Sequence, residues 1–176
     1  GVLTDRIDAH LRSGGALVFP AVTDAPIDPY RARLYTPEEL YQGLGSGYAA
    51  TPDWRTYSWW LEPTAKSDVF ATMLRAVHDD SVSDALRERI VGRRVVGVMG
   101  GHTVGRDSAT YRQAATLGRA LASTGVLVLT GGGPGVMEAA SLGARLHEQP
   151  PSALDAALDR LASVPDFKPD VGAWAT

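Results

Sequence analysis

Two short apolar runs stand out in the second half of the chain, and each is followed by a glycine-rich loop and then by a helical pattern. The runs are RVVGVM at 94–99 and VLVLT at 126–130. Continuous apolar runs of this length are typical of parallel strands that are covered on both faces. The pattern therefore predicts two buried parallel strands.

The segments that follow the two loops have the apolar spacing of helices that bury one face. The first segment is expected to end at Gly125, and the second spans 136–146 with Met137, Ala140 and Ala144 on its inner face. The residues that fall on one face of the first segment are Tyr111, Ala114, Ala115, Gly118, Leu121 and Ala122. Two strand–loop–helix units in succession predict an α/β fold, with a Rossmann-like parallel sheet, flanking helices and right-handed crossovers.

Residues 1–92 have the pattern of a smaller, irregular and helical N-terminal lobe. A first helix is expected from a cap at Thr4 to a stop at Gly14, and a short strand is expected at 16–19. Residues 20–63 are rich in proline, glycine and aromatic residues, and TPEELYQGL within them predicts a short capped helix.

Serines mark further expected helix starts. Ser67 and Ser83 each precede an apolar helical pattern, and Gly92 is expected to end the second one. SALD at 152–155 has a capping-box signature in front of a stripe of leucines. Because the two strand–loop–helix units begin after Gly92, we predict that residues 93–176 are the first part of a Rossmann-like domain that is incomplete within this chain.

Composition and charge narrow the function classes. The net charge of −3 gives no overall attraction to nucleic acid or to anionic lipid, so nucleic acid is an unlikely partner on electrostatic grounds. No apolar stretch approaches the roughly 18 residues of a membrane span, so we expect a cytoplasmic protein without a membrane partner. The chain has no cysteine, and His10, His78 and His147 are too scattered for a metal site. We expect neither a metal nor a cofactor.

Both glycine loops follow a predicted parallel strand, so they are expected at the carboxyl edge of the sheet, where open α/β folds bind ligands. Glycines allow close backbone approach, and the following helix offers unpaired N–H groups to an anion. The loops, 100–105 and 131–135, are therefore predicted to hold a phosphate group. The predicted nucleotide-binding residues are Gly100, Gly101, His102, Thr130, Gly131, Gly132, Gly133, Gly135, Val136, Met137 and Glu138.

The loops match neither of the two common nucleotide fingerprints. No Gly-Lys-Ser/Thr follows the glycines, so this is not a P-loop, and the spacing G-x-G-x-x-G is absent. A dinucleotide-binding unit also needs an acidic residue at the end of its second strand. Because that end is Thr130 followed by Gly131, the sequence does not favour NAD(P).

The stretch from Arg94 to Arg145, and TGGGPGVMEAA at 130–140 above all, resembles the LOG ("Lonely Guy") family of nucleotide phosphoribohydrolases, which includes nucleotide 5′-monophosphate nucleosidases. The resemblance implies an N-glycosidase that hydrolyses nucleoside 5′-monophosphates to a free base and ribose 5-phosphate. It also implies a homodimer or higher homo-oligomer and a reaction without metal. No catalytic residue is assigned; Glu138 is the candidate, and its alternative role is to complement the dipole of its helix.

The chain departs from that family in one motif. LOG proteins carry the phosphate loop and catalytic glutamate in Pro-Gly-Gly-x-Gly-Thr-x-x-Glu, which is absent here. Either the chain is the N-terminal portion of a longer protein that completes the site, which we favour, or it is a degenerate member that binds without cutting. The alternative function is thus a non-catalytic nucleotide-binding or cofactor-binding carrier of the same fold. A third hypothesis is a DNA-binding relative, which the net negative charge disfavours.

Several other residues have a functional and a structural interpretation. His102 could donate to a phosphate or base, but a surface role is the commoner explanation. Arg106 and Arg112 could steer a phosphate, although arginines near a helix start are usually solvated. The aromatic cluster at 54–60 suggests base stacking, but without interleaved basic residues packing or a subunit contact is the stronger expectation.

Overall fold

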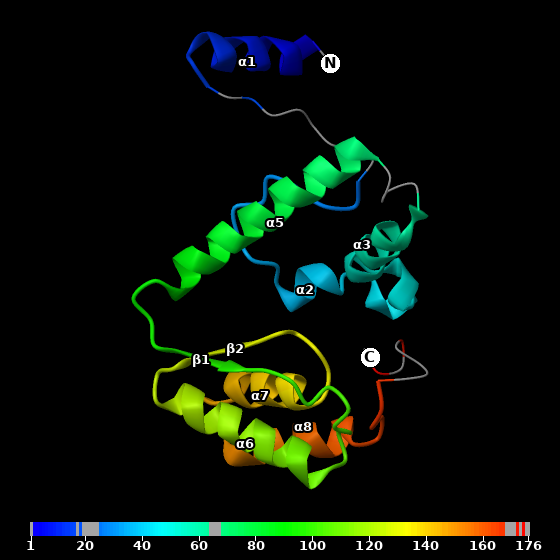
Figure 1. Cartoon of the computed structure of the whole chain (residues 1–176), viewed down its shortest axis with the longest axis vertical. Coiled ribbons are helices and arrows are strands. Elements are labelled where there is room, and N and C mark those ends of the chain that lie inside the picture. The colour runs from blue at the N-terminus through cyan, green and yellow to red at the C-terminus, as the bar shows by residue number, and fades with distance from the viewer. Residues whose placement is uncertain are drawn as a thin grey trace.

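The computed structural model describes residues 2–16, 18, 25–63, 68–167, 172 and 174. Figure 1 shows the N-terminal elements on one side of a small sheet and the helices that follow the strands on the other. The elements are α1 (Val2–Ser13), α2 (Pro37–Leu40), the 3-10 turns η1 (Leu44–Ser46) and η2 (Tyr48–Ala50), α3 (Pro52–Leu61), α5 (Val69–Ile90), β1 (Val95–Val98), α6 (Ala109–Ser123), β2 (Leu127–Thr130), α7 (Val136–Arg145) and α8 (Pro151–Leu161).

The sheet confirms the predicted α/β class. β1 and β2 pair in parallel, with Val95 opposite Leu127 and Val98 opposite Thr130. A parallel pair needs a crossover connection, and α6 supplies it. The carboxyl ends of both strands, and hence both glycine loops, therefore lie at the same edge of the sheet.

Helices α6 and α7 pack closely because glycines remove the side chains between them. A Cβ atom on Gly118 would collide with the carbonyl of Ala140, and one on Gly143 would collide with the carbonyl of Ala115. The two helix backbones are thus in contact, which fixes the position of α7 and of the loop that begins it.

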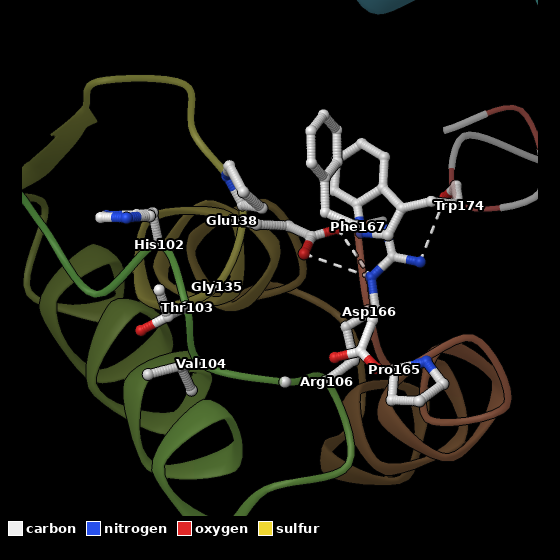
Figure 2. A pocket seen from close by; sticks show the side chains of 12 residues that line it. His102, Thr103, Val104, Arg106, Gly135, Glu138, Pro165, Asp166, Phe167 and Trp174 are labelled. Atoms are coloured by element: carbon white, nitrogen blue, oxygen red, sulfur yellow. Dashed lines mark hydrogen bonds and ion pairs between the residues drawn. The ribbon is translucent and has the colours of Figure 1, made fainter. Parts of the chain in front are cut away.

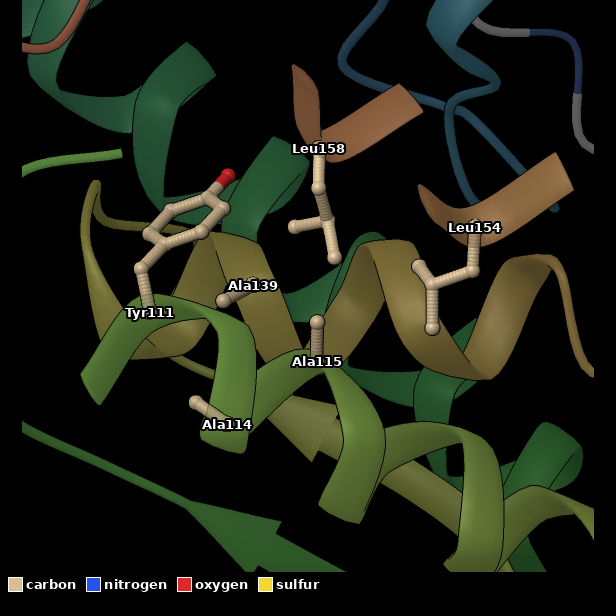
Figure 3. Close-up of a cluster of buried hydrophobic side chains, with 6 residues drawn as sticks. All are labelled: Tyr111, Ala114, Ala115, Ala139, Leu154 and Leu158. Atoms are coloured by element: carbon tan, nitrogen blue, oxygen red, sulfur yellow. The ribbon is translucent and has the colours of Figure 1, made fainter. Parts of the chain in front are cut away.

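The core of this half of the molecule lies between α6, α7 and α8, away from the sheet (Figure 3). Leu154 and Leu158 of α8 close it from outside, since both are buried. The cluster consists of Tyr111, Ala114, Ala115, Ala139, Leu154 and Leu158. The predicted inner stripes of these helices are confirmed at Tyr111 and Ala140, which have no exposed surface.

The prediction that both strands are buried on both faces is wrong, because β1 is mostly exposed and β2 is half-buried along its whole length. Val95 is 37% exposed and Met99, just beyond the strand, is 72% exposed. Nothing lies within 4 Å of a Cβ built on Gly97. The reason is that α6, α7 and α8 all lie on one side of the sheet in Figure 1, so the described residues leave strand β1 incompletely covered.

Helix boundaries in the N-terminal lobe differ from the predicted ones in two places. Helix α1 already includes Thr4, which therefore does not cap it. Ser83 does not open a helix, because α5 runs unbroken through it; its hydroxyl instead donates to the Asp79 carbonyl four residues back. Ser67 and half of the expected strand at 16–19 lie outside the described residues, and the described Ala16 and Val18 are not in a strand.

The sequence predicts capped starts for two further helices, α2 and α8. Helix α2 has the predicted capping box: Thr36 accepts from the Glu39 N–H, and the Glu39 carboxylate accepts from the Thr36 N–H. Helix α8 does not, because it starts earlier, at Pro151, with Pro150 in the capping position. Proline at the first helical position fixes the start without a side-chain cap.

Candidate functional site: a cleft beside the paired glycine loops

The two glycine loops lie side by side. The Val136 N–H donates to the Gly101 carbonyl at 3.2 Å, which joins the start of α7 to the first loop. Gly135 has φ of 73°, and a Cβ atom there would collide with the Gly101 carbonyl. Because any L side chain would be strained at this φ and would clash, the contact between the loops requires glycine at 135.

A cleft of about 650 Å³ opens where the two loops meet (Figure 2). One wall is the segment 102–106, the floor is the start of α7, and the far wall comes from residues after α8. The lining residues are His102, Thr103, Val104, Gly105, Arg106, Pro134, Gly135, Glu138, Pro165, Asp166, Phe167 and Trp174. Its volume is in the range of ordinary small-molecule sites.

The N-terminus of α7 points its partial positive charge at this region. Gly135 precedes the helix and has no side chain with which to cap it. The first N–H groups of a helix have no carbonyl four residues back to receive them. Val136 satisfies its N–H through Gly101, while those of Met137 and Glu138 come next in the same turn. A helix start of this kind favours an anion.

The strongest polar contact in the cleft is an ion pair between Arg106 and Glu138. The Arg106 Nε lies 3.1 Å from Glu138 Oε1 and 3.2 Å from Oε2, and its Nη2 lies 2.5 Å from Oε1. The Arg106 side chain is only 5% exposed and that of Glu138 19% exposed. The expectation that Arg106 is solvated is therefore wrong.

Residues near the end of the described chain hold Arg106 from its other side. The guanidinium carbon lies 4.3 Å from the centre of the Trp174 ring, and Nη1 donates to the Trp174 carbonyl at 3.1 Å. Phe167 meets the Trp174 ring edge-on, with ring centres 5.1 Å apart. Figure 2 shows the guanidinium between the Glu138 carboxylate and this aromatic pair.

This pairing decides what Glu138 can do. Its carboxylate charge is balanced by the guanidinium, and both of its oxygens accept hydrogen bonds from Arg106. A carboxylate that must stabilise a positively charged sugar or accept a proton needs its negative charge available at the substrate. In the geometry described here, both Glu138 oxygens are engaged by Arg106.

Tyr111 lies beneath this pair and has no exposed surface. Burial raises the pKa of the Tyr111 phenol above its ordinary value of 10.0, and the negative charge of Glu138 adds to the shift. The hydroxyl has no hydrogen-bond partner among the described residues. Tyr111 is therefore a neutral group at physiological pH.

The structure separates the predicted site residues into two groups. Three line the cleft: His102, Gly135 and Glu138. The others lie outside its lining: Gly100, Gly101, Thr130, Gly131, Gly132, Gly133, Val136 and Met137. The Met137 side chain lies against Gly131 and Gly133, and the Thr130 hydroxyl is 3.2 Å from that of Ser141.

Sequence reasoning missed the far wall of the cleft. Phe167 and Trp174 come after the last clear helix pattern, where no periodicity signals a role. Arg106 and Glu138 are 32 residues apart, and no motif links them. The only available signal was the closeness of both residues to a glycine loop.

The described residues lack two further kinds of feature. They contain no group of three or more His, Asp and Glu side chains placed to hold a metal ion. Within the same residues, none of the helices combines the length and hydropathy that a bilayer span requires.

The segment that carries both glycine loops is similar to a known superfamily. Residues 93–149 match the SLOG cluster4 family, which is related to LOG-type proteins. The match includes β1, α6, β2 and α7, and covers about a third of the 176 residues. No curated protein and no solved structure matches the chain. The resemblance to LOG proteins is thus supported as a similarity of residues 93–149 to the SLOG superfamily, to which LOG-type proteins are related.

Proposed function

We propose that the cleft binds the phosphate of a nucleoside 5′-monophosphate. The observation that carries this proposal is the contact between the two glycine loops, which places the uncapped start of α7 at the floor of a cleft of about 650 Å³. His102 and Thr103, both exposed in the wall, add side-chain donors. An oxyanion there gains from the helix N-terminus and from backbone N–H groups.

The reaction that we propose for this site is hydrolysis of the N-glycosidic bond, with this chain supplying the phosphate-binding part. Its support is the similarity of residues 93–149 to the SLOG cluster4 family and its LOG-type relatives. The chemistry needs a carboxylate near the anomeric carbon, because the ribose becomes positively charged as the bond breaks. Since Glu138 is paired with Arg106, that carboxylate has to be a different one.

A second candidate function is nucleotide binding without turnover. The observation that favours it is the same ion pair, which neutralises Glu138, one of the two acidic residues that line the cleft. Both candidates share the phosphate site, and they differ only in whether a bond is cut.

A negatively charged substitution in the cleft wall tests whether the cleft binds phosphate. By calorimetry, AMP and ribose 5-phosphate should bind to the wild type at least about tenfold more tightly than adenosine. Thr103→Asp should lower the affinity for both phosphates by about tenfold or more, since it places a carboxylate beside the anion. Thr103→Asn is the matched neutral control and should retain binding. Equal affinities for AMP and adenosine, or an unchanged affinity in Thr103→Asp, would refute the site.

Product analysis then separates the two candidates. AMP, CMP, GMP and UMP are incubated with the protein, and free base is followed by chromatography. Release of base that is reduced in Thr103→Asp supports hydrolysis. Tight binding with no release supports the carrier, and it leaves the phosphate site intact.

A further inference from the structure

The N-terminal lobe contains a second cavity, of about 320 Å³, between α3 and the α5 helix. It is lined mainly by rings and prolines, and its size reaches the lower end of the range for small-molecule sites. Nothing in the proposed function uses it. The question is therefore which chemistry would fill it.

One face of α3 forms a wall of this cavity. Asp53, Thr56, Tyr57 and Trp60 are spaced i, i+3, i+4 and i+7, so they share one side of the helix. Tyr57 is 55% exposed and Trp60 45% exposed, although both are large aromatic residues. The Asp53 carboxylate lies one helical turn from Tyr57 and two turns from Trp60. Packing alone does not require an exposed aromatic pair beside a carboxylate.

Several hydrogen-bond donors around the cavity already have partners. The Tyr35 hydroxyl lies 3.0 Å from His78 Nε2, and His78 Nδ1 lies 3.1 Å from the Asp79 carboxylate. The Thr56 hydroxyl donates to the Pro26 carbonyl at 3.2 Å. The cavity also offers acceptor capacity, which a ligand with donors of its own would use.

Asp53 supplies most of that acceptor capacity. The Tyr48 hydroxyl donates to its Oδ2 at 2.6 Å, and this partner is neutral. In the described part of the chain, Asp53 takes part in no ion pair, whereas Glu39 nearby pairs with both Arg31 and Arg33. The negative charge of Asp53 at the cavity wall is thus uncompensated by an adjacent cation.

Two of the rings that line the cavity already stack with arginine side chains. The guanidinium of Arg31 lies 3.8 Å from the centre of the Tyr35 ring, and that of Arg75 lies 4.5 Å from the centre of the Trp60 ring. Aromatic faces attract cations through their quadrupoles, and several such faces beside a carboxylate favour a positively charged ligand.

We propose that this cavity is a binding site for a small organic cation, an ammonium or guanidinium group on an apolar body. The charged group would lie at the Asp53 carboxylate, and the apolar body would lie against Tyr57 and Trp60. The site is distinct from the phosphate cleft, with which it shares no lining residue.

The test compares a cation with its neutral analogue. Binding of 2-phenylethylammonium and of 2-phenylethanol to the full chain is measured by calorimetry. We expect the cation to bind about tenfold more tightly. Asp53→Asn should remove that preference, while Asp84→Asn on the exposed surface of α5 should leave it unchanged. Equal affinities in the wild type, a preference that survives Asp53→Asn, or absence of saturable binding of the cation would overturn the proposal.

A second variant keeps the proposal testable if Asp53→Asn disturbs the fold. Tyr57→Leu preserves apolar volume at an exposed position but removes the aromatic face. It should weaken the cation severalfold and change the affinity for 2-phenylethanol less. Equal losses for the two compounds would contradict the cation site. AMP affinity serves as an independent check that the phosphate cleft is unaffected.

Discussion

At the scale of single residues, the pair of Arg106 and Glu138 determines the character of the cleft. Both side chains are largely buried, and Arg106 is held by the carboxylate, by the Trp174 ring and by the Trp174 carbonyl. Buried ions are costly to desolvate, so each depends on the other to remain in place. The pair therefore links the glycine loops to the end of the described chain.

Removing one member of this pair should be strongly destabilising. Glu138→Gln leaves the Arg106 guanidinium buried without its anion, and we expect a loss of about 3 kcal/mol in the free energy of unfolding. Urea denaturation monitored by circular dichroism measures it. The control is Arg112→Gln, whose ion pairs with Asp155 and Asp159 are exposed and should contribute less than about 1 kcal/mol. Similar losses in the two variants would show that the Arg106 pair is solvated.

The buried phenol of Tyr111 should make the stability of the protein depend on pH in the alkaline range. The raised pKa of its buried phenol means that the unfolded chain releases this proton at a lower pH than the folded chain does. The unfolded state therefore binds fewer protons above pH 10.0, and stability falls as pH rises. Tyr111→Phe should be within about 1 kcal/mol of wild type at pH 7, because the hydroxyl has no partner to lose.

Above pH 10.0 the variant should lose less stability than the wild type as pH rises. Chemical denaturation at a series of pH values gives both slopes. Tyr48, whose pKa burial also raises, contributes equally to the two proteins. Parallel slopes would mean that Tyr111 ionises in the folded state as readily as in the unfolded one.

At the scale of elements, the contact between α6 and α7 positions the cleft. Small residues let the two backbones touch, and this holds the start of α7 against the first glycine loop. The predicted stripe of α6 includes Gly118, which lies at this contact, whereas the predicted stripe of α7 includes Ala140 but omits the buried Ala139 and Gly143.

Adding one methyl group at this contact should be costly. Gly143→Ala places a Cβ atom against the Ala115 carbonyl, which is backbone and cannot move aside, so we expect a loss of about 3 kcal/mol. Gly97→Ala in β1 meets nothing within 4 Å and should be neutral or slightly stabilising. Thermal unfolding of both variants checks the difference. A tolerated Gly143→Ala would contradict the close packing.

Element types were predictable where periodicity is strong, and boundaries were not where serine was the only signal. Ser83 lies inside α5, and Ser152 lies behind a helix start already fixed by Pro151. A serine signature is local, and it is overridden when the flanking residues can themselves continue or begin the helix. The burial of β1 was overestimated because an apolar run does not show how many faces are covered.

At the scale of the whole molecule, side-chain contacts join parts of the chain that are distant in the sequence. Arg106 reaches Trp174 across 68 positions, and Glu38 of α2 lies 3.4 Å from Arg145 at the end of α7. The glycine loops could be predicted because each is encoded within a few consecutive residues. The Arg106 environment could not, because tertiary packing alone brings its partners together.

The central claim is that the start of α7 and the two adjoining glycine loops form the phosphate site. A titration of ¹⁵N-labelled protein with AMP, followed by two-dimensional NMR, tests it most directly. The account predicts that the largest amide shifts fall within 102–106 and 135–138, beside the cleft, and are reproduced by ribose 5-phosphate. Shifts confined to other parts of the chain, or shifts that adenosine produces equally well, would contradict it.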